Sequence, residues 1–290
     1  MKAEVYDHLV DTSNFSGQTI VVKLGGSAIC DETNMVLLLN EVATMVKAGA
    51  KVAIVHGGGP DISMKLKESG KICRFVDGLR VTDEDVLSIA EEVLSSLNEK
   101  IVSCLEGAGV KAKGMSSIEH HPVLARKKWI MGTSGGKLDI GLVGEVASCD
   151  GEILSAIAAD TVPVLYSLAP DASGQLYNIN ADHVATAVAT ALSADKLVYV
   201  SDVSGILLDV ENGIVLPELP VSDIGIMIDS GVVRGGMIPK VRGCAAAIAS
   251  GVKSVIICQV LSAGSLLVAV AKPGSSGTVI TGSAAMKVAV

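Results

Sequence analysis

Strand-like apolar runs alternate with glycine turns and helix-like segments at the start of the chain, and this order limits the possible folds most strongly. Apolar runs cover residues 19–24 and 51–55. Each leads into a glycine turn and then into a segment with apolar residues at helical spacing. A strand-helix-strand-helix order joins parallel strands through right-handed crossovers. The sequence therefore predicts an α/β fold with a mainly parallel central sheet.

Composition supports this fold class. Hydrophobic residues make up 49% of the 290 residues, whereas aromatic residues make up only 2%. The core must therefore consist of Val, Ile, Leu and Ala, which suits buried parallel strands covered by alanine-rich helices.

Charge and cysteine usage exclude several classes of protein. The net charge of −8 argues against a nucleic-acid-binding protein, since such proteins carry basic patches. No apolar run is long enough for a membrane span, and no signal peptide is visible. The six cysteines form no CxxC pair, so we expect reduced thiols in a cytoplasmic protein.

Further periodic segments extend the α/β pattern to the end of the chain. Thr82 is expected to cap a long helix with Asp83, Glu84 and Asp85 in its first turn. Residues 110–148 are expected to form short strands and hairpins. Helices are also expected at 31–47, 152–159, 180–194 and 239–251, and strands at 162–167, 196–201, 254–258 and 277–281.

The two glycine turns have the chemistry of an anion site. Lys23-Leu24-Gly25-Gly26 and His56-Gly57-Gly58-Gly59-Pro60 each follow a predicted strand and precede a predicted helix. Glycine lets backbone N–H groups approach a ligand closely, and a helix N-terminus favours negative charge. A phosphate-handling enzyme is the function that this pattern favours.

Eight short motifs, in order along nearly the whole chain, resemble those of the amino acid kinase family. Any one of them is weak evidence, but their common order is specific. Within the family, they are most similar to those of enzymes that phosphorylate N-acetyl-L-glutamate. The motifs are VKLGG at 22–26, VHGGGP at 55–60, GLRVTD at 78–83, GLVGEV at 141–146, NINAD at 178–182, SDVSGIL at 201–207, GGMIPKV at 235–241 and GTVI at 277–280.

This resemblance implies an architecture and an activity. The fold would be a three-layer αβα sandwich with two lobes. Residues 1–192 would form an N-terminal lobe that binds the acyl amino acid and dimerises, and residues 193–290 a C-terminal lobe that binds ATP. The reaction would transfer the γ-phosphoryl group of ATP, with Mg²⁺, to the side-chain carboxylate of N-acetyl-L-glutamate in arginine biosynthesis. The protein would be a homodimer.

Three residues are expected to be catalytic. The acceptor carboxylate is already ionised at neutral pH, so the reaction needs positioning and positive charge rather than a general base. Lys23 lies at the end of a strand, and Lys240 stands where the family places its second catalytic lysine. By resemblance, Asp182 would hold both ammonium groups. An ordinary surface lysine and a first-turn helix acid are the alternative interpretations.

The remaining site residues are carried over from the motifs. The expected substrate-binding residues are Gly58, Gly59, Arg80 and Asn178, with Arg80 suited to a bidentate pair with a carboxylate. The expected nucleotide-binding residues are Gly25, Gly26, Ser201, Asp202, Val203, Ser204, Gly205, Ile206, Leu207, Gly236, Met237 and Lys240. No metal-binding carboxylate cage stands out, so Mg²⁺ is expected to be held largely by phosphate oxygens and water.

Three other functions compete with this one. A kinase of the same fold could act on acetylaminoadipate or glutamate, because Arg80 and Asn178 would recognise features that these acids share. A non-catalytic ligand sensor would be favoured by loss of either lysine or Asp182, but all three are present. A dinucleotide-dependent dehydrogenase needs G-x-G-x-x-G after the first strand, and Lys23–Ala28 lacks that spacing.

Overall fold

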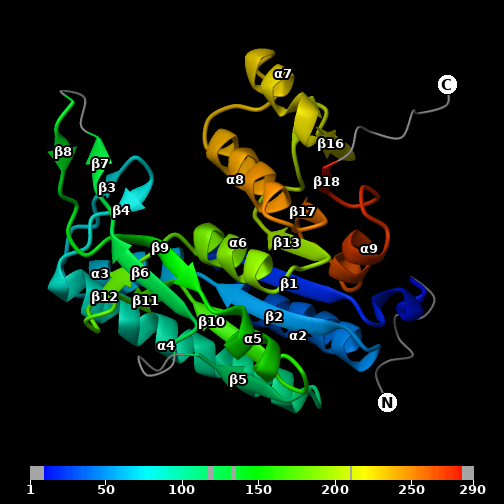
Figure 1. Cartoon of the computed structure of the whole chain (residues 1–290), viewed down its shortest axis with the longest axis horizontal. Helices are drawn as coiled ribbons and strands as arrows, with labels where there is room; N and C mark the ends of the chain where they lie inside the picture. The colour runs from blue at the N-terminus through cyan, green and yellow to red at the C-terminus, as the bar shows by residue number, and fades with distance from the viewer. Residues whose placement is uncertain (1–9, 116–120, 132–134, 210, 283–290) are drawn as a thin grey trace.

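An eight-stranded sheet forms the centre of the protein (Figure 1). The computed structural model describes residues 10–115, 121–131, 135–209 and 211–282. The strands follow the order β16-β18-β17-β13-β1-β2-β10-β5. Their bounds are β16 Glu218–Pro220, β18 Thr278–Thr281, β17 Ser254–Cys258, β13 Lys196–Val200, β1 Thr19–Leu24, β2 Lys51–His56, β10 Val162–Tyr166 and β5 Ala112–Gly114.

The sheet is parallel except at one position. β1 pairs in parallel with β2 on one side and with β13 on the other. Among the described strands of this sheet, only the β17–β18 pair is antiparallel. The mainly parallel sheet expected from the sequence is therefore confirmed. Because β13 pairs directly with β1, strands from the two expected lobes share one continuous sheet.

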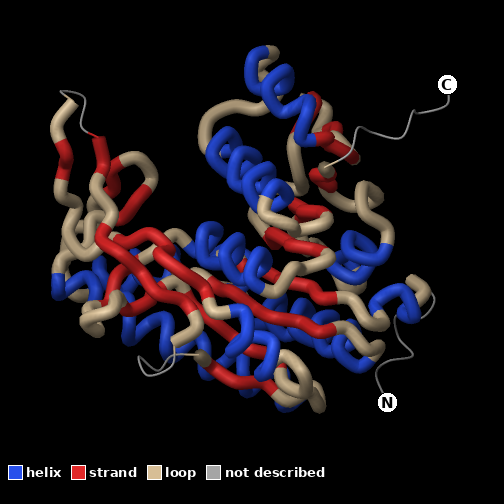
Figure 2. Tube along the Cα trace, in the orientation of Figure 1, coloured by secondary structure: helices blue, strands red, loops and turns tan. Residues whose placement is uncertain are grey.

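Helices cover both faces of the sheet, as Figure 2 shows. Alternate residues of β1 explain how: Ile20 and Val22 belong to one hydrophobic cluster, and Val21 belongs to the other. The first face is covered by α2 Glu32–Lys47, α4 Glu84–Gly107 and α9 Ser265–Ala271, and the second by α5 Gly151–Ile157, α6 Ala181–Ala191 and α8 Met237–Ala249. The three-layer αβα arrangement is confirmed.

Short elements surround this sandwich. Antiparallel pairs form between β3 and β4, β6 and β9, β7 and β8, β11 and β12, and β14 and β15. Their bounds are β3 Phe75–Val76, β4 Leu79–Arg80, β6 Val123–Lys127, β9 Gly144–Cys149, β7 Ile130–Met131, β8 Lys137–Leu138, β11 Leu168–Pro170, β12 Leu176–Asn178, β14 Leu207–Asp209 and β15 Ile214–Val215. The remaining helices are α1 Gly26–Ile29, α3 Gly59–Glu68 and α7 Ile224–Asp229, with 3₁₀ turns η2 Thr12–Phe15 and η3 Val221–Asp223. Among the described residues, no helix has both the length and the apolar character needed to cross a bilayer.

The expected cap of the long helix is wrong by one residue. Asp83, not Thr82, is the N-cap of α4, and its carboxylate accepts a hydrogen bond from the Val86 N–H. Thr82 belongs to the preceding extended segment, and its hydroxyl donates to the Arg80 carbonyl and accepts a hydrogen bond from Asn178 Nδ2. A tertiary contact outside the helix therefore moved the start, although both residue types are good caps.

The buried carboxylate of Glu41 links α2 to α9 on the first face of the sheet. Glu41 of α2 is fully buried, and its oxygens accept hydrogen bonds from the N–H groups of Gly264, Leu266 and Leu267. These donors lie at the start of α9, where backbone N–H groups lack partners within the helix. Burial raises the pKa of Glu41, although the three N–H donors favour its ionised form.

We predict that Glu41→Ala lowers the free energy of unfolding by about 3 kcal/mol, because it leaves three buried N–H groups without acceptors. Urea unfolding at pH 7 measures this loss. Glu32→Ala on the same helix is the control, because Glu32 is exposed. Equal stabilities of the Glu41→Ala protein and the control would contradict the prediction.

Candidate functional site

Three charged side chains meet at the carboxyl ends of the central strands. Lys23 lies near the end of β1, Asp182 in the first turn of α6, and Lys240 in the first turn of α8. α6 leads into β13 and α8 leads into β17, and both strands run parallel to β1, so the two helices begin at the edge of the sheet where β1 ends. Residues far apart in sequence therefore meet at this edge.

Asp182 lies between the two lysines. Lys23 Nζ is 2.9 Å from Asp182 Oδ1, and Lys240 Nζ is 2.9 Å from Oδ2. Lys240 makes an aligned hydrogen bond, whereas Lys23 makes an ion pair. The side chains of Lys23 and Lys240 are only 14% and 18% exposed. Two cations and one anion thus share a largely buried site with an excess of one positive charge.

The electrostatics of Asp182 follow from this arrangement. Burial alone raises the pKa of Asp182, but the charges of Lys23 and Lys240, with the hydrogen bond from Lys240, outweigh it and lower the pKa to about 2. The carboxylate therefore stays ionised at neutral pH and keeps both ammonium groups in place.

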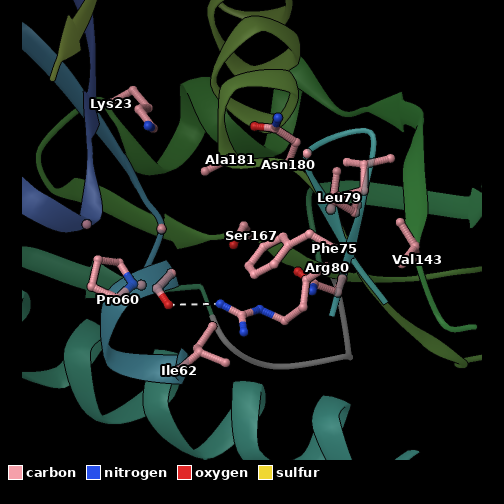
Figure 3. A pocket seen from close by; sticks show the side chains of 17 residues that line it. Lys23, Pro60, Ile62, Phe75, Leu79, Arg80, Val143, Ser167, Asn180 and Ala181 are labelled. Atoms are coloured by element: carbon pink, nitrogen blue, oxygen red, sulfur yellow. Dashed lines mark hydrogen bonds between the residues drawn. The ribbon is translucent and has the colours of Figure 1, made fainter. Parts of the chain in front are cut away.

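A cavity of about 280 Å³ lies next to this cluster (Figure 3). Its volume is near the lower end of the range of about 300–1,000 Å³ that is usual for ligand sites, so it suits a small metabolite. Lys23 and Arg80 lie on opposite sides of it, and Asn180 and Ala181 border it at the start of α6. Its lining residues are Lys23, Gly26, Gly57, Gly58, Gly59, Pro60, Ile62, Phe75, Gly78, Leu79, Arg80, Val143, Ser167, Asn178, Ile179, Asn180 and Ala181.

The two glycine turns pack against each other beside this cavity. A Cβ atom on Gly26 would lie 2.5 Å from Pro60 Cδ, so only glycine permits this approach. Gly58 is similarly close to the Leu94 side chain, whereas a Cβ atom on Gly59 would meet nothing within 4 Å. The N–H of Gly25 donates to the Val200 carbonyl and is therefore engaged within the protein.

Arg80 is buried and connects the β3–β4 hairpin to α3. Its Nη2 donates to the Gly59 carbonyl at 2.8 Å and to Ser63 Oγ at 2.9 Å, and its Nη1 contacts Cys73 Sγ. The guanidinium also lies over the Phe75 ring, 4.9 Å from its centroid. Burial lowers the pKa of Arg80 from its usual high value. These contacts fix the guanidinium on one side of the cavity.

Asn178 and Asn180 approach the cavity from the segment before α6. Asn178 Nδ2 donates to Thr82 Oγ1 at 3.1 Å, which links β12 to the start of α4. Asn180 caps α6 by accepting a hydrogen bond from the Asp182 N–H at 2.8 Å. Asn180, Ser167 and Phe75 line the cavity but were not among the expected site residues. The capping pattern before Asp182 could have indicated Asn180, whereas Ser167 and Phe75 carry no comparable sequence signal.

His56 is the first residue of the second glycine turn, and its ring is held by hydrogen bonds within the protein. It is fully buried, its Nδ1–H donates to the Gly57 carbonyl, and its Nε2 accepts from Asn98 Nδ2. Burial lowers the pKa of His56 to about 4. The ring is therefore neutral at pH 7 and has no free nitrogen for proton transfer.

The residues expected to bind nucleotide do not line the cavity, except Gly26. The segment 201–207 follows β13, where the Ser201 N–H donates to the Cys258 carbonyl, and Gly236 and Met237 begin α8. This segment starts next to the first glycine turn, because a Cβ atom on Gly25 would lie 3.9 Å from both Ser201 Cα and Lys23 Nζ. Gly25 and Ser201 therefore lie near Lys23, and all the expected nucleotide-binding residues except Gly26 lie outside the cavity.

The described residues hold no group of three or more acidic, histidine or cysteine side chains that could bind a metal ion. The Asp182 carboxylate, in the charge cluster beside the cavity, is already paired with two lysines. This donor set does not fit a resident divalent cation.

Comparisons with known proteins agree on one family. The model of the amino acid kinase family matches residues 18–259. An acetylglutamate kinase from Methanoculleus marisnigri is 40% identical over 83% of this chain and 85% of its own length. An acetylglutamate kinase from Methanococcus aeolicus is 37% identical over 97% of this chain and 98% of its own length.

Solved structures share the fold. A protein from Streptococcus mutans superimposes with a TM-score of 0.72 at 31% identity, over 91% of this chain and 99% of its own. The N-acetylglutamate synthase of Neisseria gonorrhoeae, complexed with coenzyme A and N-acetyl-glutamate, has a TM-score of 0.81 at 21% identity. That match covers 98% of this chain and 63% of the synthase.

We predict that Gly26→Ala lowers the free energy of unfolding by about 2 kcal/mol, because the new methyl group overlaps the rigid ring of Pro60. Gly59→Ala is the matched control, since its methyl group has open space and alanine is the better helix former. Urea unfolding of both variants tests the difference. A Gly26→Ala protein as stable as the wild type would contradict the packing of the two turns.

Proposed function

Because the chain belongs to the amino acid kinase family, we propose that it transfers the γ-phosphoryl group of ATP to the side-chain carboxylate of N-acetyl-L-glutamate, in arginine biosynthesis. The products are N-acetylglutamyl 5-phosphate and ADP. The observation that carries the proposal is the cluster of Lys23, Asp182 and Lys240 beside a cavity of metabolite size.

The charges of Lys23 and Lys240 offset the main obstacle to this reaction, which is repulsion between two anions. An anionic carboxylate must approach a polyanionic nucleotide, and negative charge then spreads over the oxygens of the transferring group. Lys23 and Lys240 supply two positive charges in a site with little solvent, where electrostatic stabilisation is strong. Asp182 balances one of these charges and holds both side chains, so they need no reorganisation during the reaction.

We assign the acid to the cavity and the nucleotide to neighbouring segments, of which only Gly26 also lines the cavity. Arg80, Asn178, Gly58 and Gly59 would bind the acid, since all four line the cavity. The N-terminal glycine turn at Gly25 and Gly26, residues 201–207 and the start of α8 would bind ATP. Support for this division comes from Ser201, which lies next to Gly25 and Lys23. The proposed lobes, 1–192 and 193–290, then meet at the Lys23–Asp182–Lys240 cluster.

Magnesium is proposed to accompany ATP as part of the nucleotide substrate, since the protein's own donor set does not fit a resident ion. From the family relationship we also infer a homodimer. The six cysteines form no disulfide, which supports a location in the reducing cytoplasm.

A kinase of acetylaminoadipate or glutamate is the second candidate, because the cavity contacts would suit several small dicarboxylic acids. ADP release from purified protein with Mg-ATP and each of the three acids separates these functions. Faster turnover of one of the other acids would identify that acid as the substrate. Measurable ATP binding without turnover of any acid would favour a non-catalytic sensor.

We predict that Lys240→Ala lowers kcat with N-acetyl-L-glutamate by about 10²- to 10³-fold and changes the KM for the acid by less than about 3-fold. The reason is that the lost charge acts on the transferring group rather than on the bound acid. Steady-state kinetics measure both constants. Lys111→Ala, which removes a 78% exposed lysine, is the control. A rise in KM with unchanged kcat would place Lys240 in ground-state binding instead.

We also predict that Asp182→Asn lowers the free energy of unfolding by roughly 2 kcal/mol at pH 7, since the folded pKa of about 2 lies below the ordinary value of 3.8. This stabilisation is complete above about pH 4 and is lost as the pH falls through 2. The difference between wild type and variant should therefore shrink by roughly half at pH 3.

Urea unfolding at pH 7, 5 and 3 measures the difference. Asp160→Asn is the control, because Asp160 is 71% exposed and its difference should stay near zero throughout. If the stability difference between the wild type and Asp182→Asn grew as the pH fell, the ion pairs could not be its source.

A further inference from the structure

Tyr199 is a large aromatic residue in a core that is otherwise mainly aliphatic. Aromatic residues make up only 2% of the chain, and among the described strands of the central sheet tyrosine occurs at Tyr166 of β10 and Tyr199 of β13, both buried. Tyr199 lies in the middle strand β13, is 2% exposed and is among the largest fully buried side chains of the described residues. A buried phenol costs free energy unless its hydroxyl is hydrogen-bonded, so this position needs an explanation.

The ring of Tyr199 lies against the ammonium group of Lys240. Lys240 Nζ is 4.9 Å from the ring centroid, within the distance of about 6 Å at which a cation is attracted to an aromatic face. Tyr199 is also the register partner of Lys23 on β1. Paired residues of adjacent parallel strands point to the same face of the sheet, so the ring and both lysines lie on the face covered by α6 and α8.

The hydroxyl of Tyr199 is tied to the backbone of Asp182. It lies 2.9 Å from Thr186 Oγ1 and donates to the Asp182 carbonyl oxygen at 3.3 Å. Thr186 Oγ1 donates to the same carbonyl oxygen at 2.9 Å. One end of the tyrosine is thus fixed at the first turn of α6, and its ring face is held beneath Lys240.

This arrangement restrains Lys240 in a way that Asp182 alone does not. A lysine side chain has four rotatable bonds, and Asp182 fixes only the ammonium group through one hydrogen bond. The ring attracts the cation without removing a proton or competing as a second anion, because burial raises the pKa of Tyr199 well above its usual value and the phenol stays neutral. Positive charge at Lys240 is therefore preserved for an anionic ligand.

We propose that Tyr199 is a positioning residue for Lys240: its ring holds the ammonium group in place, and its hydroxyl fixes the ring to the α6 turn that carries Asp182. Neither the family match nor the motifs assign a role to this position. The proposal rests on the role of Lys240 in the proposed phosphoryl transfer.

Substitutions that separate the ring from the hydroxyl test this proposal. Tyr199→Met keeps an apolar side chain but removes the ring, and we expect kcat to fall about 10-fold while the KM for N-acetyl-L-glutamate stays within about 2-fold. Tyr199→Phe keeps the ring, and Thr186 still donates to the Asp182 carbonyl, so kcat should stay within about 3-fold. A folded Tyr199→Met protein with wild-type kcat would overturn the proposal.

Two further variants test whether a general loss of core packing, rather than loss of the ring contact, lowers kcat. Phe15→Met removes another fully buried ring, in η2, which has no place in the proposed site, and its kcat should be unchanged. Tyr199→Met in the Lys240→Ala background should cause no further loss of kcat, because the ring then has no cation to hold. The same 10-fold loss in both backgrounds would show that the ring acts on the fold rather than through Lys240.

A chemical measurement tests the ring contact without the reaction. Lys240 should react faster with the amine reagent acetic anhydride in Tyr199→Met than in the wild type or in Tyr199→Phe, as measured by peptide mass spectrometry. Equal rates in all three proteins would overturn the positioning role. The wild type could also fail to turn over N-acetyl-L-glutamate while Lys240 is still labelled faster in Tyr199→Met. That result would refute the proposed function and support the contact between the ring and the ammonium group.

Discussion

The attraction of two ammonium groups to the single carboxylate of Asp182 is the interaction on which the site depends. Lys23 reaches it from β1 and Lys240 from α8, so the charge cluster connects segments more than 200 residues apart. Two lysines this close would repel each other strongly without the anion between them. The capping of α6 by Asn180 and the hydrogen bond from Thr186 to the Asp182 carbonyl fix that anion in turn.

The parallel sheet makes this interaction possible. Adjacent parallel strands end at one edge, and helices that follow them start there, with partly positive N-termini. The cluster, the two glycine turns and the cavity all lie at this edge. A chain with a net charge of −8 can therefore offer a local surplus of positive charge where an anionic ligand would bind.

Several polar groups at the site serve the fold as well as any ligand. The Gly25 N–H donates to Val200, and the Arg80 guanidinium donates to Gly59 and Ser63. These bonds hold the first glycine turn against β13 and the β3–β4 hairpin against α3. A ligand at this site would meet groups already held in position, which lowers the conformational entropy that binding costs.

The sequence by itself determined the strand and helix order and the parallel sheet, because hydrophobic periodicity and glycine turns are local signals. It singled out Lys23 by its place at a strand end, and Asp182 and Lys240 through the resemblance of their motifs to the amino acid kinase family. The β17 strand was predicted to its last residue, whereas the cap at Thr82 was wrong because the Thr82 hydroxyl is engaged by the Arg80 carbonyl and by Asn178. Only the tertiary structure brought the two lysines to one carboxylate, made Phe75 and Ser167 part of the cavity and placed Tyr199 beneath Lys240. Such contacts depend on strand register and helix packing, which join residues that no local pattern relates.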